Sequence, residues 1–232
     1  MQRGTRQMKL LSKTILISMA MINLSCETKG ASPLKENPKK DVNFEKTSIQ
    51  SKESVNTDHV LGNYVLLMMN IVNTNASFAK KNVIARSIVN VSNDIFSSLE
   101  EKKHFVTMIA IESKFNTDAV SSAGAVGLTQ VIPKYAKEFA ERCGMNDVRP
   151  EDLKNPDINL LVGACRFKAL LDNFNGNTAA ALVAYNAGLA SDQLKQLKSL
   201  KNITNVESSS YVVKWLYLKD KADAQMKKVS EE

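Results

Sequence analysis

The chain has 232 residues, of which 44% are hydrophobic and 24% are charged, and these ordinary globular proportions exclude a wholly disordered or fibrous protein. The length suits one folded domain with a short appendage. The formal net charge is +7, but four of the 31 basic residues lie in the first 26 positions, so that 27 basic residues face 24 acidic ones beyond them, a balance of +3. That part of the chain has no dense basic cluster interleaved with aromatic residues, which argues against nucleic-acid binding.

Residues 1–26 have the pattern of a secretory signal peptide. They contain no acidic residue, and an apolar run of 11 residues from Thr14 to Leu24 follows the basic residues Arg3, Arg6, Lys9 and Lys13. A helix that crosses a bilayer needs about 20 apolar residues, so we predict an export signal rather than a permanent transmembrane helix. The same pattern is present if translation begins at Met8.

The apolar run ends in Leu24-Ser25-Cys26, which resembles the lipobox of bacterial lipoproteins, where the cysteine is lipidated after cleavage. Asn23 departs from that pattern, because an aliphatic residue usually stands there, so plain cleavage without a lipid is the alternative. A lipid on Cys26 would anchor the protein at a membrane without spanning it. We therefore expect an exported protein on the periplasmic face of a membrane, as an outer-membrane lipoprotein.

Residues 27–57 are too polar to build a core, because only six of these 31 positions are apolar. We interpret them as a disordered, flexible tether, with a solvated helix as the alternative. The folded domain is then expected to cover residues 58–232.

Within that domain the apolar residues recur with the period of an α-helix, and no run alternates as a strand does, which predicts a compact all-α domain. The expected helices cover residues 60–72 and 83–96, a segment that ends near Asn116 and Thr117, residues 133–143, 156–175 and 178–187, and a segment that contains Tyr211, Trp215 and Leu218.

Glu112 stands where a helix should place an apolar residue. Phe105, Met108 and Ile109 are spaced i, i+3 and i+4, and Glu112 continues the series at i+7, so its carboxyl faces the core. Apolar neighbours and the carbonyl end of a helix both raise the pKa of a carboxylic acid. Cleavage of a glycosidic bond needs such a protonated group, because the departing sugar oxygen must receive a proton. The alternative is that the helix frays and Glu112 simply reaches water.

The segment after Glu112 combines two glycines with neutral polar side chains. Glycine permits a positive φ or a close backbone approach, and hydroxyl and amide groups suit sugar hydroxyls and acetamido groups. No G-K-[ST] motif and no preceding strand occur, so the segment is a poor phosphate loop. The residues concerned are Ser113, Ser121, Ser122, Gly124, Gly127, Thr129 and Gln130.

Three ordered motifs resemble the soluble-lytic-transglycosylase-type catalytic domain: E-S-K-F-N at Glu112 to Asn116, S-S-A-G-A-V-G-L-T-Q at Ser121 to Gln130, and A-Y-N-A-G at Ala184 to Gly188. The resemblance spans about residues 83–218 and implies a goose-type-lysozyme-like helical fold. It also implies cleavage of the β-1,4 bond between N-acetylmuramic acid and N-acetylglucosamine in peptidoglycan, with Glu112 as the single catalytic acid. That residue would then act as a base while the muramoyl C6 hydroxyl closes onto the anomeric carbon, which gives a 1,6-anhydro product.

The resemblance further implies which residues surround this acid. Ser113 and Ser121 are expected to orient Glu112 and the substrate's acetamido group, and Gln130 is expected to line the sugar groove. Thr129 stands where the family commonly has methionine, so we expect an altered groove wall and subsite preference without loss of activity.

Two more segments of the family pattern contribute to the expected groove. Tyr185 and Asn186 are expected to face Glu112 from their helix, with ordinary core packing as the alternative for Tyr185. The segment from Glu207 to Val212 resembles the family's closing E-T-x-x-Y-V motif, whose glutamate borders the cleft, although this chain has one residue more between Glu207 and Tyr211.

Cys143 and Cys165 remain if Cys26 carries a lipid, and in an exported domain they form either a disulfide or two buried thiols. The two histidines have no metal-binding spacing, so we predict no metal and no cofactor. The expected partners are peptidoglycan glycan strands and, through the lipid, a membrane, and we expect a monomer. The alternative functions are a goose-type-lysozyme-like hydrolase and a non-catalytic peptidoglycan-binding lipoprotein.

Overall fold

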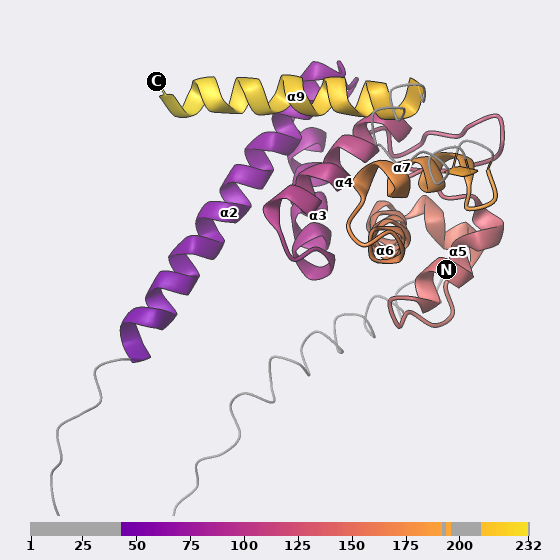
Figure 1. The fold of residues 1–232 in the computed structure, drawn as a ribbon, viewed down its shortest axis with the longest axis horizontal. Coiled ribbons are helices and arrows are strands. Elements are labelled where there is room, and N and C mark those ends of the chain that lie inside the picture. The colour runs from indigo at the N-terminus through magenta and orange to yellow at the C-terminus, as the bar shows by residue number, and fades with distance from the viewer. Residues whose placement is uncertain (1–42, 192–193, 196–209, 232) are drawn as a thin grey trace, which may run out of the picture. The chain divides into compact units, whose positions relative to one another are not determined.

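The computed structural model describes residues 43–191, 194–195 and 210–231. The predicted signal peptide with Cys26, the first part of the predicted tether and Glu207 lie outside the described residues. Helices make up most of the described chain (Figure 1), namely α2 (Asn43–Ile71), α3 (Phe78–Ile95), α4 (Leu99–Glu112), α5 (Ala136–Glu141), α6 (Pro156–Asn173), α7 (Thr178–Ala187) and α9 (Ser210–Glu231), with the 3-10 turns η1 (Pro133–Tyr135) and η2 (Pro150–Lys154). The predicted all-α class is confirmed.

The helix boundaries follow from side chains that can satisfy the free backbone N–H groups at a helix start. Ser98 accepts a hydrogen bond from the N–H of Glu101 at the start of α4. Asn155 and Asn177 do the same for α6 and α7, the two starts that the sequence predicts. None of the described helices is both long and apolar enough to cross a membrane.

Helix α2 begins earlier than the sequence predicts. It starts at Asn43, so residues 43–57, which we expected to continue the tether, are helical in the structure. Many of these residues are serine, glutamate, lysine and glutamine, which a solvated helix accommodates, and the helix runs on without interruption into the buried face that begins at Leu61. Whether residues 27–57 act as a tether stays a prediction.

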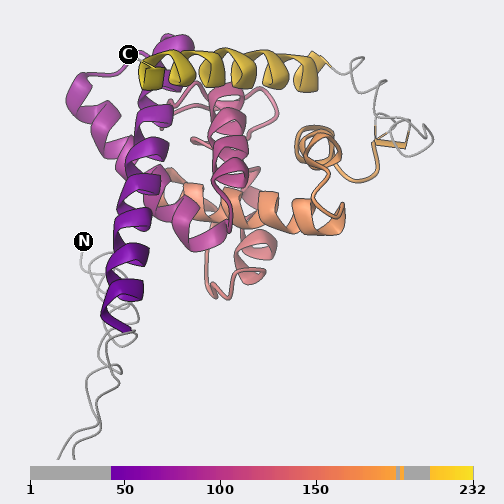
Figure 2. The same cartoon turned by 60° about the vertical axis from the view of Figure 1, so that its left-hand side comes forward.

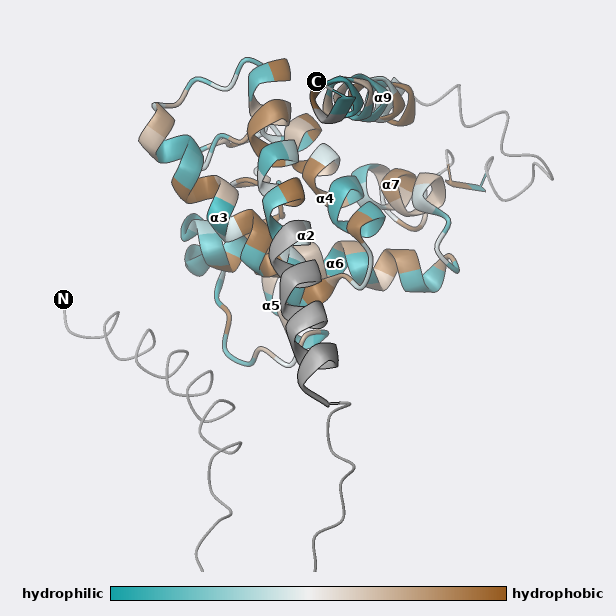
Figure 3. Cartoon of the chain, turned by 90° about the vertical axis from the view of Figure 1, so that its left-hand side faces the viewer, coloured by the Kyte–Doolittle hydropathy of each residue, from teal (hydrophilic) through white to brown (hydrophobic). Residues whose placement is uncertain are grey.

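Helix α6 is the centre of the domain, because it packs against α3, α5 and α7. Leu160, Ala164, Phe167 and Leu171 recur at helical spacing and are buried, and Phe174, which continues the series, is partly buried. Figure 3 shows hydrophobic and hydrophilic residues interspersed along the helices, as expected for helices that turn one face toward a shared core.

Helix α9 lies across α4 and α7 (Figures 1 and 2). Its buried residues are Val212, Trp215, Leu218 and Ala222, which recur at helical spacing on the side that faces the core. Trp215 stacks edge-on against His104 of α4, with ring centroids 5.0 Å apart.

Four charged side chains also join α4 to α9. Lys219 of α9 pairs with Glu100 of α4 (3.1 Å) and with Asp223 of its own helix (2.6 Å). Lys103 of α4 pairs with Glu100 (3.2 Å) and Asp223 (3.1 Å), which closes a ring of ion pairs. Networks of this kind hold their geometry better than isolated surface pairs, because each charge has two partners.

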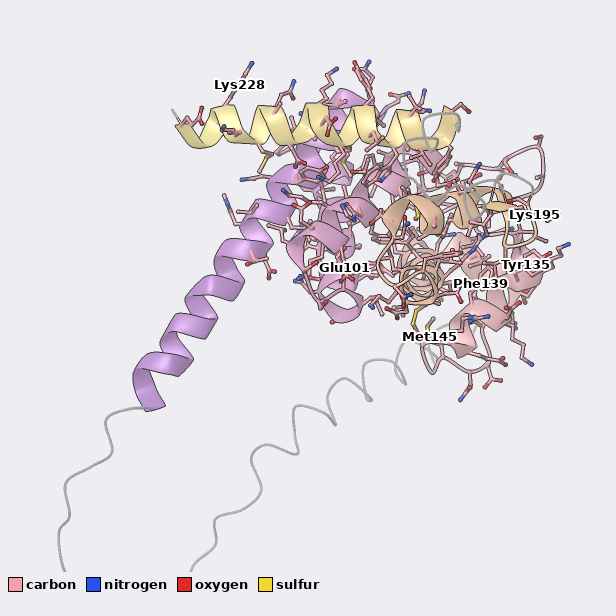
Figure 4. The ribbon with its side chains drawn as sticks, viewed as in Figure 1. Glu101, Tyr135, Phe139, Met145, Lys195 and Lys228 are labelled. Carbon is pink, nitrogen blue, oxygen red and sulfur yellow. A yellow bond between two sulfur atoms is a disulfide. The ribbon has the colours of Figure 1, made fainter. Side chains whose placement is uncertain are left out.

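A smaller apolar cluster forms around α5 and contains Val131, Ala136, Ala140, Leu153 and Val162. A disulfide between Cys143 and Cys165 ties the end of this region to α6, with Cα atoms 5.9 Å apart (Figure 4). Of the two states that the sequence leaves open for these cysteines, the structure has the disulfide.

Candidate active site

Glu112 is the last residue of α4, and it lies on the face that the sequence predicts. Phe105, Met108 and Ile109 on the same stripe are fully buried, and Glu112 itself is partly buried. The expectation that this helix continues to Asn116 and Thr117 is wrong. The chain leaves the helix because Lys114 and Phe115 adopt left-handed backbone conformations with φ of 52° and 61°, a turn that buries the Phe115 ring.

Tyr211 of α9 is the hydrogen-bond partner of this carboxyl. Its hydroxyl donates to Oε1 of Glu112 across 2.6 Å. Burial, and then the nearby Glu112 carboxylate, raise the pKa of Tyr211 well above its ordinary value, so Tyr211 keeps its proton and remains a donor. The two residues are 99 positions apart in the sequence, and the packing of α9 on α4 brings them together.

Opposing influences act on the pKa of Glu112. Burial raises it, whereas the hydrogen bond from Tyr211 and the positive charges of Arg166 and Lys214 lower it. Burial is the largest of these, so the pKa lies above its ordinary value. A carboxylic acid of this kind can hold a proton at a higher pH than a solvated glutamate and still has groups that stabilise its anion.

The loop between α4 and η1 is held in shape by its own polar residues. The Ser121 hydroxyl accepts a hydrogen bond from the N–H of Ala125 (3.0 Å), and the Gln130 amide donates to the carbonyls of Gly127 (2.9 Å) and Ala119 (3.2 Å). Ser121 and Gln130 therefore shape the loop, and the sugar contacts that the motif implies for them stay predictions. Gly127 has a φ of 76°, and a Cβ atom there would lie 2.3 Å from the Asn159 amide, so only glycine fits.

We expected Thr129 to alter the wall of the groove, but its side chain is fully buried and cannot line an open groove. Its N–H donates to Oδ1 of Asn159 (2.9 Å) and its hydroxyl donates to the Asn159 carbonyl (2.9 Å). Tyr185 of α7 donates its hydroxyl to the carbonyl of Thr129 (2.7 Å). These bonds tie the loop to α6 and α7, because a buried polar group needs a partner. The bond from the Thr129 hydroxyl is the one that methionine could not make, since the other two use the backbone of Thr129.

The remaining predicted residues differ in their placement. Ser113 is buried and its hydroxyl donates to the Ile109 carbonyl (3.3 Å), so it closes the end of α4. Tyr185 is almost fully buried, and burial raises the pKa of its hydroxyl, which the charge of Arg166 lowers and that of Glu112 raises further. Asn186 is exposed at the end of α7.

Sequence reasoning did not select three residues that act on Glu112, namely Tyr211, Arg166 and Lys214. Tyr211 is the tyrosine of the closing motif, and its place in that motif was the sequence feature that could have indicated a role at the site. Arg166 lies beside the apolar stripe of α6 and looks like a solvated residue in the sequence. In the structure its guanidinium carbon lies 4.1 Å from the ring centroid of Tyr185, and its Nη2 donates to the Tyr185 carbonyl (2.6 Å).

No group of three or more histidine, cysteine, aspartate or glutamate side chains in the described part of the chain could hold a metal ion. Glu112 brings a partly buried carboxylic acid to the candidate site, Tyr211 a hydroxyl group, and Arg166 and Lys214 positive charges.

The described domain is all-α, and Glu112 stands at the end of a helix whose other stripe residues are buried in the core. Residues 98–207 match the family model described as "Transglycosylase SLT domain". The resemblance read from the three motifs is thereby confirmed, because residues 98–207, which contain all three motifs, are similar to this family's domain.

Known proteins with similar sequences or structures agree with that assignment. A putative soluble lytic murein transglycosylase of Haemophilus influenzae is 36% identical over 97 residues, which are 41% of this chain and 16% of that protein. A membrane-bound lytic murein transglycosylase E of Buchnera aphidicola is 30% identical over 110 residues, 44% of this chain and 52% of its own length. The X-ray structure of an inactive glutamate-to-glutamine mutant of lytic transglycosylase Slt from Pseudomonas aeruginosa matches with a TM-score of 0.52 and 26% identity, over 61% of this chain and 24% of that one.

The chain thus spans about half of the Buchnera protein and a much smaller part of the Haemophilus one.

Proposed function

We propose that this protein is a peptidoglycan lytic transglycosylase, which cleaves the β-1,4 bond between N-acetylmuramic acid and N-acetylglucosamine without consuming water. The observation that supports this best is Glu112, a carboxyl with a raised pKa at the end of α4, inside the segment that matches the SLT family. The similar Pseudomonas protein is described as inactive when a glutamate is replaced by glutamine, which agrees with chemistry that depends on one acid.

In the proposed reaction, protonated Glu112 donates its proton to the glycosidic oxygen as the bond to the muramoyl anomeric carbon breaks. The resulting carboxylate is stabilised by the Tyr211 hydroxyl and by the charges of Arg166 and Lys214. It then removes the proton of the muramoyl C6 hydroxyl, whose oxygen bonds to the anomeric carbon. The acid is regenerated, and the product is a 1,6-anhydro sugar.

One carboxyl is enough for this sequence, because the substrate's acetamido oxygen assists at the anomeric carbon in the family that the motifs resemble. Glycosidases that use water normally need a second carboxylate. Among the described residues, the groups that act on the pKa of Glu112 are the Tyr211 hydroxyl and the cations Arg166 and Lys214, with no second acid, which agrees with the single-acid route.

The substrate contacts are proposed from the family motifs. Ser113 and Ser121 would orient the acid and the acetamido group, and Gln130, Tyr185, Asn186 and Glu207 would line the sugar groove. Ser113, Ser121, Gln130 and Tyr185 already hold the backbone around Glu112, so each would act through the shape of the loop as well as by contact.

Incubation of the purified protein with peptidoglycan, followed by mass spectrometry of the released fragments, tests this function. We expect anhydromuropeptides, and we expect Glu112→Gln to reduce their release by roughly 10²- to 10⁴-fold, the contribution of a general acid. Products one water heavier would show a hydrolase. A folded wild-type protein that binds glycan but releases nothing would instead be a peptidoglycan-binding protein.

We further propose that the protein acts at the cell envelope after export, as a monomer anchored through a lipid on Cys26. The apolar run that ends in Leu-Ser-Cys supports this, and the Buchnera relative is named as membrane-bound. Mass spectrometry of the mature N-terminus distinguishes an acylated Cys26 from a plain cleaved end.

A further inference from the structure

The two charged residues that influence the pKa of Glu112 are both cations. Arg166 of α6 and Lys214 of α9 are the charged groups that act on its pKa, and both lower it. While Glu112 holds its proton, it contributes no negative charge to balance these cations. Within the described part of the chain the site is therefore positive when it is ready to donate a proton, and it attracts an anionic group.

Arg166 is held in place without an acidic partner. Its guanidinium carbon lies 4.1 Å from the ring centroid of Tyr185 and 4.8 Å from that of Phe139, and its Nη2 donates to the Tyr185 carbonyl (2.6 Å). A guanidinium has five N–H donors, and contact with aromatic rings leaves donors at its edge available for a carboxylate. Arg166 is only partly buried, so such a group can reach it.

Arg142 and Arg149 differ from Arg166 in this respect. Arg142 pairs with Glu138 (2.9 Å), and Arg149 pairs with Asp152 and Glu151 (both 3.0 Å). In contrast, no aspartate or glutamate of the described chain lies within ion-pair distance of Arg166. A fixed cation without an acidic partner beside a reacting group is better suited to bind a ligand anion than to stabilise the fold.

Lys214 supplies the second cation. It is exposed and lies three residues after Tyr211 on α9, so the two side chains project from the same side of that helix.

Phe139, which contacts the Arg166 guanidinium, lies beside Tyr135 with ring centroids 5.9 Å apart, and Tyr135 is 39% exposed (Figure 4). The row from Arg166 to Tyr135 thus reaches the surface, where an aromatic ring can receive a sugar face.

We propose that Arg166, assisted by Lys214, forms a carboxylate-binding subsite beside Glu112 that holds an acidic group of the glycan strand during cleavage. This inference rests on the proposed function and names the form of substrate that the site selects. Peptidoglycan offers carboxylates from two sources. The lactyl group of muramic acid carries a free carboxylate where the stem peptide has been removed, and stem peptides carry carboxylates farther from the sugar.

The lactyl carboxylate fits the position of Arg166 better, because it belongs to the sugar whose bond is cleaved. An anion bound between Arg166 and Lys214 also offsets their positive charges, which otherwise lower the pKa of Glu112. Binding of a peptide-free strand would therefore favour the protonated acid at the step that needs it.

Three forms of one glycan preparation test the proposal: strands freed of peptide, the same strands with the lactyl carboxyl converted to a methylamide, and strands with intact stem peptides. For the wild type we expect kcat/KM on the free-carboxylate strands to exceed that on the methylamide strands by about tenfold or more, as for a charge-assisted hydrogen bond. Arg166→Gln should bring this ratio close to one. A preference for peptide-bearing strands that Arg166→Gln removes would assign the subsite to the stem peptide.

Arg86→Gln is the matched control, because Arg86 is exposed on α3, bonds only to the Asn82 carbonyl and does not act on Glu112. It removes the same charge and should leave the ratio unchanged. Arg166→Lys keeps the charge and should retain part of the preference. A purely structural role of Arg166 would lower cleavage of all strands alike.

Equal cleavage of the three strands by the wild type, or an unchanged ratio in Arg166→Gln, would overturn the subsite and leave the transglycosylase function standing. If the wild type cleaves none of the strands, the proposed function fails, and equilibrium binding of the same strands still decides about the subsite. The subsite is supported if the wild type binds the free-carboxylate strands more tightly than the methylamide strands, and if this preference weakens with salt and is lost in Arg166→Gln. Equal affinity for the strands refutes the subsite.

Discussion

Removal of the Tyr211 hydroxyl should change the ionisation of Glu112 in a defined direction. The 2.6 Å distance between the Tyr211 hydroxyl and Oε1 of Glu112 lies in the range of hydrogen bonds to an ionised carboxylate. Such bonds contribute about 1.5 to 3 kcal/mol, against about 0.5 to 1.5 kcal/mol for neutral ones. Tyr211→Phe therefore withdraws roughly 1 kcal/mol or more of preferential stabilisation from the carboxylate, close to a tenfold change in the ionisation equilibrium.

The pKa of Glu112, already raised by burial, should rise further in Tyr211→Phe. In the pH profile of kcat/KM, the limb on which activity falls as Glu112 loses its proton should then move to higher pH. At its optimum the variant should be slower by roughly tenfold, because the carboxylate that acts as the base is less well stabilised.

Tyr217→Phe is the control, since Tyr217 lies on the same helix and is 61% exposed. A limb that stays in place or moves to lower pH in Tyr211→Phe, with the fold intact by circular dichroism, would refute this account of the acid.

Three further outcomes concern stability. Burial raises the pKa of Glu112 in the folded state, so the stability that its protonated form gives is present below the unfolded-state pKa and is lost as pH rises through the folded-state pKa. Above the folded-state pKa, Glu112→Gln should therefore raise Tm, by about 2 to 4 °C for each kcal/mol gained. An equal or lower Tm of the variant in that pH range would contradict this account. Reduction of the disulfide, which joins cysteines 22 positions apart, should cost about 3 kcal/mol, or a Tm decrease of roughly 10 °C in a calorimetric scan. Gly163→Ala places a methyl group 2.3 Å from Thr129 and should cost about 1 to 3 kcal/mol in denaturant unfolding, whereas Gly62→Ala, with no atom within 4 Å, should be neutral or stabilising.

The sequence predicts the helical class well because the apolar period is clear along the domain, and it predicts a boundary where a capping side chain marks one. Asn155 and Asn177 start helices where they were expected, and the stripe that leads to Glu112 is buried. Where a boundary depends on tertiary packing the prediction fails, as at the end of α4, which the burial of Phe115 sets.

The candidate site is less predictable than the fold, because its parts meet only through long-range packing. Periodicity identifies Glu112, but no local pattern shows that Tyr211 contacts it from 99 residues away or that Arg166 stacks on Tyr185. The burial of Thr129 likewise depends on Asn159, which lies 30 residues further along the chain. Such residues become visible only when the helices are placed against one another.

The dependence of Glu112 on α9 has a consequence for the timing of activity during synthesis. A nascent or truncated chain that stops before Ser210 already contains the glutamate and its loop, yet it lacks the hydroxyl of Tyr211, the positive charge of Lys214 and the α9 half of the ion-pair ring. In fragments from premature termination or proteolysis, Glu112 would therefore lack the hydrogen bond from Tyr211 and the nearby charge of Lys214. On the proposed mechanism, completion of the C-terminal helix, rather than the presence of the glutamate, determines when the candidate site is assembled.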